Sequence, residues 1–199
     1  MPTAPATAPG TAPGTAPGTA PGTARGDERA AAAAAQASLM LAPSTVERVS
    51  QCLPIPEPWN NDVRQSWVSL LGAGRAAVPV LEALDQEGIV SGLIPEWEAV
   101  RSLPQRNPIH EFTVDRHLVE TAVHAGQRAR DVARPDLLLV GAFLHDIGKG
   151  YPGDHSVVGA DMTRDIAERM GFNPADVATL ELLVRHPLLL PDIATRRDL

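Results

Sequence analysis

Cysteine, long apolar runs and a targeting segment are scarce or absent in this sequence, and each absence excludes a class of protein. The 199 residues include a single cysteine, Cys52, which excludes an intramolecular disulfide framework and a cysteine-rich zinc site. No apolar run approaches the roughly 18 residues of a membrane span. The N-terminus has neither the basic start nor the apolar stretch of a secretory signal. We therefore expect a cytoplasmic protein with no membrane partner.

Basic residues are also under-represented. The sequence has 24 aspartates and glutamates against 17 lysines and arginines, which gives a net charge of −7. The charges of residues 1–45 cancel, so the acidic excess falls on residues 46–199. Because an acidic domain is poorly suited to the phosphate backbone of nucleic acids, no nucleic-acid partner is expected. Lys149 is the only lysine in the chain.

The first 45 residues have low complexity. They contain four tandem Thr-Ala-Pro-Gly units, from Thr7 to Gly22, and six consecutive alanines, from Ala30 to Ala35. Such a tract cannot bury enough surface to offset its chain entropy. We expect residues 1–45 to be a disordered tail, with marginal helicity in the alanine run. Residues 46–199 are numerous enough to fold without disulfides.

From Val46 onward the sequence predicts an all-α fold, because apolar residues recur at helical spacing and strand-like alternation is almost absent. Thr113 is expected to be an N-cap, as is Asn173 before Pro174. A proline-bearing connection or short helix is expected at 93–100, and an irregular segment at 104–112. The remaining expected helices are 62–71, 76–86, 113–133, 135–145, 155–170 and 174–186.

Histidine is concentrated in the last four expected helices. His145 is followed directly by Asp146, after the apolar run 137–144. Imidazole and carboxylate together suit Zn, Mn or Fe and leave positions for water. The turn 147–150 contains two glycines, which would allow a ligand to approach the backbone closely. The alternative is a chance His-Asp dipeptide that caps a turn. Five of the six histidines lie in or beside these helices: His117, His124, His145, His155 and His186.

One stretch resembles the HD-domain metal-dependent phosphohydrolases. It runs His145-Asp146-Ile147-Gly148-Lys149-Gly150, followed by His155-Ser156 and Gly159-Ala160. Upstream, residues 110–117 resemble the segment before the first metal histidine in one branch, the bifunctional uridylyltransferase/uridylyl-removing enzymes that modify the nitrogen-regulatory protein PII. That resemblance continues, in the same order, through residues 92–96, 183–186 and 196–199.

Two residues depart from the pattern of that branch. Phe112 stands where a tyrosine is expected, and Arg116 stands where an acid is expected. Neither is expected to be a metal ligand, so the departures leave the implied metal site intact.

The resemblance implies an HD-domain helical bundle over residues 113–199, preceded by a helical lead-in segment over residues 46–112. It also implies one or two divalent ions, of Mn, Fe, Mg or Zn. Asp198 lies one residue from the end, where the helix that should hold it is missing or incomplete, so the domain is expected to be truncated. The family pattern of ligands falls on His117, His145, Asp146, His155, His186 and Asp198.

Each implied histidine ligand outside the His-Asp pair has a structural alternative. His117 could be a helix-surface histidine, and His155 could cap the helix that it opens. His186 could be a histidine favoured by the dipole at a helix C-terminus. His124 matches no ligand position, which favours a packing or supporting role.

Lys149 and Asp146 are the expected catalytic residues. As the resemblance implies, Asp146 would orient the nucleophile, while Lys149 would stabilise negative charge developing on a phosphodiester; a solvated turn lysine is the alternative. His110 could bind substrate phosphate or be an ordinary loop histidine. Asp161 and Asp165 are interpreted as solvated helix positions.

Other domains of the resembled enzymes have no counterpart here. No segment supplies the Gly-Ser turn and paired carboxylates of a nucleotidyltransferase domain, and no glutamine-sensing ACT domain is visible. The sequence therefore predicts hydrolysis without transferase activity, and hydrolysis that is weak or unregulated.

Three functions remain open. The first is removal of UMP or AMP from nucleotidylated PII by a metal-dependent phosphodiesterase. The second is a phosphohydrolase that acts on a free nucleotide. The third is a catalytically inactive fragment that only binds a partner.

Overall fold

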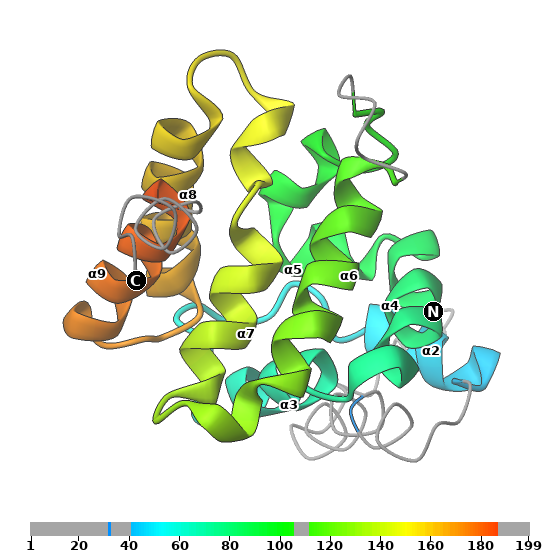
Figure 1. Ribbon diagram of the computed structural model, residues 1–199. Helices are drawn as coiled ribbons and strands as arrows, with labels where there is room; N and C mark the ends of the chain where they lie inside the picture. Colours follow the sequence, from blue (N-terminus) through cyan, green and yellow to red (C-terminus); the bar gives the residue numbers. More distant parts are fainter. Residues whose placement is uncertain (1–31, 33–40, 106–111, 187–199) are drawn as a thin grey trace, which may run out of the picture.

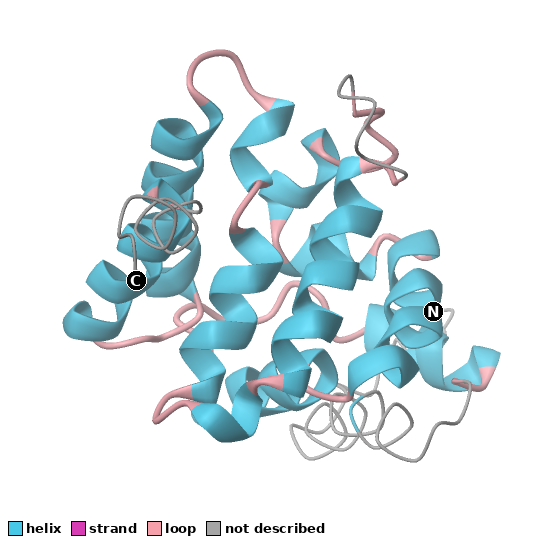
Figure 2. Cartoon of the chain, viewed as in Figure 1, coloured by secondary structure: helices cyan, strands magenta, loops and turns pink. Residues whose placement is uncertain are grey.

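The computed structural model describes residue 32 and the ranges 41–105 and 112–186, and these ranges confirm the all-α prediction. Figures 1 and 2 show helices joined by short loops, and no strand occurs in the described residues. The α-helices are α2 (Pro43–Ser50), α3 (Asn61–Leu71), α4 (Ala77–Gln86), α5 (Ile89–Leu93), α6 (Val114–Gln127), α7 (Pro135–Leu144), α8 (His155–Arg169) and α9 (Pro174–Arg185). The 3₁₀ turns are η1 (Gly74–Ala76), η2 (Pro95–Ala99), η3 (Ala129–Asp131) and η4 (Ile147–Gly150).

Helix α7 lies at the centre of the molecule, in contact with α3, α6 and α9 (Figure 1). Its side chains are apolar on most sides, as expected of a helix surrounded by others. Phe143, near its C-terminal end, is fully buried between two tryptophans. The ring centroid of Trp97 lies 4.9 Å away in a stacked arrangement, and that of Trp67 lies 5.3 Å away edge-on. This aromatic cluster fixes the end of α7, from which His145 and Asp146 follow.

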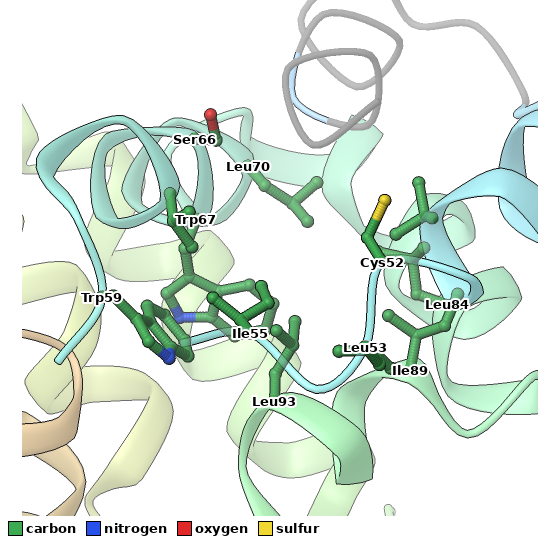
Figure 3. A pocket seen from close by; sticks show the side chains of 12 residues that line it. Cys52, Leu53, Ile55, Trp59, Ser66, Trp67, Leu70, Leu84, Ile89 and Leu93 are labelled. Atoms are coloured by element: carbon green, nitrogen blue, oxygen red, sulfur yellow. The ribbon is translucent and has the colours of Figure 1, made fainter. Parts of the chain in front are cut away.

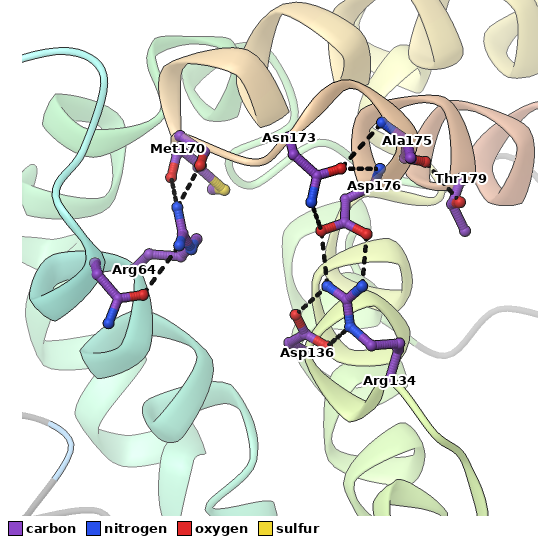
Figure 4. Close-up of polar contacts among 10 residues, drawn as sticks. Arg64, Arg134, Asp136, Met170, Asn173, Ala175, Asp176 and Thr179 are labelled. Atoms are coloured by element: carbon purple, nitrogen blue, oxygen red, sulfur yellow. Dashed lines mark hydrogen bonds and ion pairs between the residues drawn. The ribbon is translucent and has the colours of Figure 1, made fainter.

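Helices α8 and α9 pack against each other beside α7. Gly171, with φ of +75°, ends α8 in the left-handed conformation that glycine adopts readily. The Arg64 guanidinium of α3 donates to the carbonyls of Met170 and Gly171 (Figure 4). The C-terminal end of α8 is therefore tied to the lead-in helices, and helices α6 to α9 share one core with residues 46–112.

The start of α9 is tied to the start of α7 by Arg134. Its guanidinium donates to both carboxylate oxygens of Asp176, at 2.6 and 2.8 Å, and to both oxygens of Asp136 (Figure 4). Asn173 caps α9, as predicted, by accepting from the backbone N–H groups of Ala175 and Asp176. Because the guanidinium donates to it, the pKa of Asp176 is lowered despite the opposing effect of desolvation.

Replacing Arg134 with methionine is expected to lower the Tm by several degrees at pH 7. The Asp176 pKa is depressed in the folded state, so its stabilisation is present above the unfolded pKa of about 4 and is lost as the pH falls. The difference in Tm between wild type and variant should therefore shrink in acid. Thermal unfolding from pH 7 to pH 3 measures it, with the exposed Arg130→Met as control. A constant difference across this range would contradict the assignment.

A small apolar pocket opens among the lead-in helices. It is lined by apolar side chains of α2 to α5 and of the segment between α2 and α3, among them Leu53, Leu70 and Leu93 (Figure 3). Trp67 separates it from the aromatic cluster around Phe143. Neither His145 nor Asp146 lines the pocket.

The structure differs from the sequence expectation at the end of one helix, in two further helices and at one cap. Helix α6 ends at Gln127 and not near residue 133, because 129–131 form a 3₁₀ turn and Arg134 precedes a proline, which disfavours helical backbone. Helices α2 and α5 were not predicted, and α2 begins at Pro43, inside the segment interpreted as a tail. Thr113 occupies the N-cap position of α6 but makes no side-chain capping bond. Residues 1–31 and 33–40 of the predicted tail lie outside the described residues.

No single described helix has the length and apolar character of a membrane span. Helices α3 and η1–α4 reach that length and composition only when taken together, as a pair bent by 109°.

Candidate metal centre

Two histidines from different helices face each other at the end of α7. His117 lies in the first turn of α6, and His145 follows the last residue of α7. Their Nε2 atoms are 3.2 Å apart. The His117 side chain is 25% exposed and the His145 side chain 19%. The His117 ring therefore faces a second imidazole. A histidine that merely lay on the helix surface would need no such neighbour.

Asp146 completes a triangle with the two imidazoles. Its Oδ2 lies 3.3 Å from Nε2 of His145 and 3.5 Å from Nε2 of His117. The Asp146 side chain is only 8% exposed. These three residues are the only group of potential metal ligands found among the described residues, with donor atoms within 4.8 Å of one another.

The tautomer of His145 is set by the backbone. Its Nδ1 lies 2.8 Å from the carbonyl oxygen of Ala142, one turn earlier. Because a carbonyl can only accept a hydrogen bond, Nδ1 carries the proton and the lone pair of the neutral ring lies on Nε2. Metal-binding histidines are commonly oriented in this way, by donation of the other ring N–H to a carbonyl or carboxylate.

Lys149 lies on the same carboxylate. Its Nζ is 2.7 Å from Oδ2 of Asp146 and 3.0 Å from Oε1 of Gln105. Burial raises the pKa of Asp146, but the neighbouring His145 and then the hydrogen bond and charge of Lys149 outweigh burial and hold the pKa well below its ordinary value. Asp146 is therefore a carboxylate over the ordinary pH range, as a metal ligand must be.

The two glycines around Lys149 are required by packing against protein backbone. A Cβ on Gly148 would lie 2.2 Å from the carbonyl oxygen of His155 and 2.6 Å from the backbone nitrogen of Gly159. A Cβ on Gly150 would lie 2.6 Å from the carbonyl oxygen of Ala99. Sequence reasoning assigned these glycines to close approach by a ligand, whereas the close neighbours in the structure are α8 and η2.

His155 lies at the edge of this group. Its Nε2 is 3.9 Å from Oδ1 of Asp146, the oxygen that does not face the other two histidines, and its side chain is 48% exposed. Asp154 is the cap of α8, because its carboxylate accepts from the N–H groups of Ser156 and Val157. Asp154, and not His155, therefore caps α8.

The remaining predicted residues fall elsewhere. His186 is exposed at the C-terminal end of α9, outside the three-residue group, and His124 is exposed on α6. Asp161 forms ion pairs with Arg164 and Arg185. Asp198 and His110 lie outside the described residues.

The two departures from the family pattern contact each other. The guanidinium of Arg116 lies 5.8 Å from the ring centroid of Phe112. The same guanidinium pairs with Glu120 at 2.9 Å and with Glu82. Arg116 therefore neutralises Glu120, a buried acid of α6, and its contacts are with these acids and not with the His-Asp pair.

The donor set fits a divalent metal ion. Separations of 3.2 to 3.5 Å among two imidazole nitrogens and one carboxylate oxygen match ligands that share an ion about 2.1 Å from each. Two neutral nitrogens and one carboxylate also leave coordination positions for water, as in catalytic sites. The set is compatible with several metals and selects none of them.

Sequence reasoning missed Gln105 and the Ala142 carbonyl. The carbonyl lies three residues before His145, so helical geometry alone could have suggested it. Gln105 lies in a segment predicted to be irregular, and no local pattern marks it.

The family model described as HD domain matches residues 114–194. Three similar proteins are named bifunctional uridylyltransferase/uridylyl-removing enzyme. The one from Streptomyces coelicolor is 58% identical over 165 residues, which cover 82% of this chain and 20% of that protein. The one from Mycobacterium tuberculosis (strain CDC 1551) is 51% identical, covering 81% and 20%, and the one from Corynebacterium glutamicum is 39% identical, covering 80% and 23%.

The chain therefore spans about a fifth of the length of these relatives. The matched HD segment begins at α6 and contains His117, His145 and Asp146, the donors that the structure brings together. Residues 114–194 of the chain therefore match the HD domain, the domain of metal-dependent phosphohydrolases.

Proposed function

We propose that this chain hydrolyses the phosphodiester that links a nucleotide to a tyrosine of the PII protein and so releases UMP or AMP. The observation that carries the proposal is the placement of Lys149 on the carboxylate that faces His117 and His145. The names of the similar proteins support a uridylyl group as the one removed. The protein is proposed to act in the cytoplasm.

The His117, His145 and Asp146 side chains would hold the divalent ion. Such an ion lowers the pKa of a bound water toward neutrality and polarises a phosphoryl oxygen. Asp146 is ionised and buried, so it can orient the attacking water. His145 is held by the Ala142 carbonyl, so its Nε2 needs no reorientation. A second ion held with His155 and His186, and a contribution from Asp198, remain predictions.

Lys149 would stabilise the charge that develops on the phosphoryl group. Its ammonium has three N–H donors, and its contacts with Asp146 and Gln105 account for two of them. The third is left for a phosphoryl oxygen of the substrate. As oxygen from water bonds to phosphorus, the bond from phosphorus to the tyrosine oxygen breaks, and that oxygen takes a proton.

The test is incubation of the purified chain with uridylylated PII in the presence of Mn²⁺, with and without chelator. We expect metal-dependent release of UMP and return of PII to its unmodified mass. Turnover of free nucleotides without release from PII would favour the second function. A folded, metal-loaded protein that hydrolyses neither substrate would favour a fragment that only binds a partner.

A further inference from the structure

A carboxamide that sequence reasoning did not single out lies beside the candidate metal centre. Gln105 belongs to the segment between η2 and α6, and its Oε1 accepts a hydrogen bond of 3.0 Å from Nζ of Lys149. The same Nζ lies 2.7 Å from Oδ2 of Asp146. The Lys149 side chain therefore links the Gln105 amide to the Asp146 carboxylate, which faces the imidazoles of His117 and His145.

The contact with Lys149 fixes which end of the amide faces the ammonium. A lysine ammonium donates hydrogen bonds and accepts none, so the group of Gln105 that faces it must be the oxygen. The usual ambiguity between amide oxygen and nitrogen is thus resolved by chemistry. Nε2, which carries two N–H donors, is then the end of the amide that is not hydrogen-bonded to Lys149.

The Nε2 atom of Gln105 is buried and has no hydrogen-bond partner among the described residues. The other buried side-chain atoms without a partner there are Trp67 Nε1 and Thr163 Oγ1. Of these three side chains, Gln105 is the one hydrogen-bonded to a proposed catalytic residue. A buried amide without a partner is unfavourable, so this arrangement suits an acceptor that arrives with a ligand.

We propose that Gln105 is a substrate-binding residue that donates from Nε2 to a non-bridging phosphoryl oxygen of the scissile nucleotide. The inference rests on the proposed function, since it assigns a contact within the same site. Gln105 and Lys149 then act on one phosphate, with the amide as a neutral donor and the ammonium as a charged one. Two adjacent N–H donors, Gln105 Nε2 and Lys149 Nζ, are suited to bind the oxygen acceptors of a phosphodiester.

Two substitutions separate this role from mere support of Lys149. Gln105→Glu keeps an oxygen for Lys149 but replaces the Nε2 donor with a second oxygen. Gln105→Met removes both groups at similar size. If Nε2 contacts the substrate, both variants should lose about tenfold or more in kcat/KM, mainly through KM, and bind UMP about tenfold or more weakly. Mn²⁺ binding and Tm should stay near wild type.

The readouts are UMP binding to Mn²⁺-loaded protein by calorimetry and hydrolysis of uridylylated PII and of bis(4-nitrophenyl) phosphate. Gln65→Glu, at an exposed glutamine of α3, controls for the added charge. Wild-type affinity and KM in Gln105→Glu, with loss only in Gln105→Met, would overturn the proposal in favour of support of Lys149. Wild-type behaviour of both variants, or no UMP binding by wild type, would also overturn it.

Failure of the proposed function gives a different result. Wild type would then release no UMP from PII, yet the Gln105 variants would still weaken UMP binding and hydrolysis of the small phosphodiester. The two claims are therefore tested separately by the same set of proteins.

Discussion

Asp146→Asn is expected to lower the rate of phosphodiester hydrolysis by at least about a hundredfold while the protein stays folded. The substitution keeps the shape of the side chain but removes the negative charge that would hold a divalent ion and that pairs with Lys149. Because outer-shell mutations alone commonly cost 10–100-fold in metal affinity or activity, loss of a direct ligand should cost at least as much. Steady-state kinetics with uridylylated PII and metal analysis of the same preparations measure it.

Asp161→Asn is the matched control for this prediction. Asp161 is exposed on α8 and pairs with Arg164 and Arg185 away from the three-residue group. Its loss should leave metal content and rate within about twofold of wild type, as is usual for surface ion pairs. An Asp146→Asn variant that keeps wild-type rate and metal content would contradict the assignment of Asp146.

Gly148→Ala is expected to have the largest effect on stability, about 3 kcal/mol of destabilisation. The added Cβ would lie 2.2 Å from the His155 carbonyl oxygen and 2.6 Å from the Gly159 nitrogen, and both are backbone atoms that no side-chain rotation can move. The turn 147–150 and α8 would have to separate. Asp146 and Lys149 are in or beside this turn, so metal affinity should fall as well.

Urea unfolding with Gly126→Ala as control measures this effect. Gly126 lies in α6, and a Cβ there would have its nearest neighbour at 3.7 Å, an ordinary contact. That variant should be as stable as wild type or up to about 1 kcal/mol more stable, since alanine favours helix over glycine. Equal stability of the Gly148→Ala and Gly126→Ala variants would show that the turn is not packed as described.

Helices with strong local signals could be predicted from the sequence. Asn173 before Pro174 located the start of α9, and Gly171 located the end of α8. Helix α5 was missed because it is only one turn long and has no side-chain cap. The early end of α6 was missed because the helical apolar pattern continues past Gln127, while the backbone is diverted by the approach to Pro135.

The site was predictable only in part. The His-Asp pair follows a buried apolar run, which is a local signal, and the resemblance added His117. The approach of Gln105 to Lys149 depends on how the segment after η2 folds over the turn 147–150, and this long-range packing leaves no periodic trace in the sequence. The packing role of Gly148 was equally hidden, because its neighbours belong to α8.

The most direct test of the central claim is the stoichiometry of Mn²⁺ binding to chelator-treated protein, measured by calorimetry for wild type, His117→Ala and His124→Ala. His117 and His124 lie seven residues apart on α6, but only His117 faces His145. We expect wild type and His124→Ala each to bind at least one equivalent of Mn²⁺, and His117→Ala to bind it at least about tenfold more weakly. A folded wild type that binds no divalent metal, or equal affinity in all three proteins, would contradict the central claim.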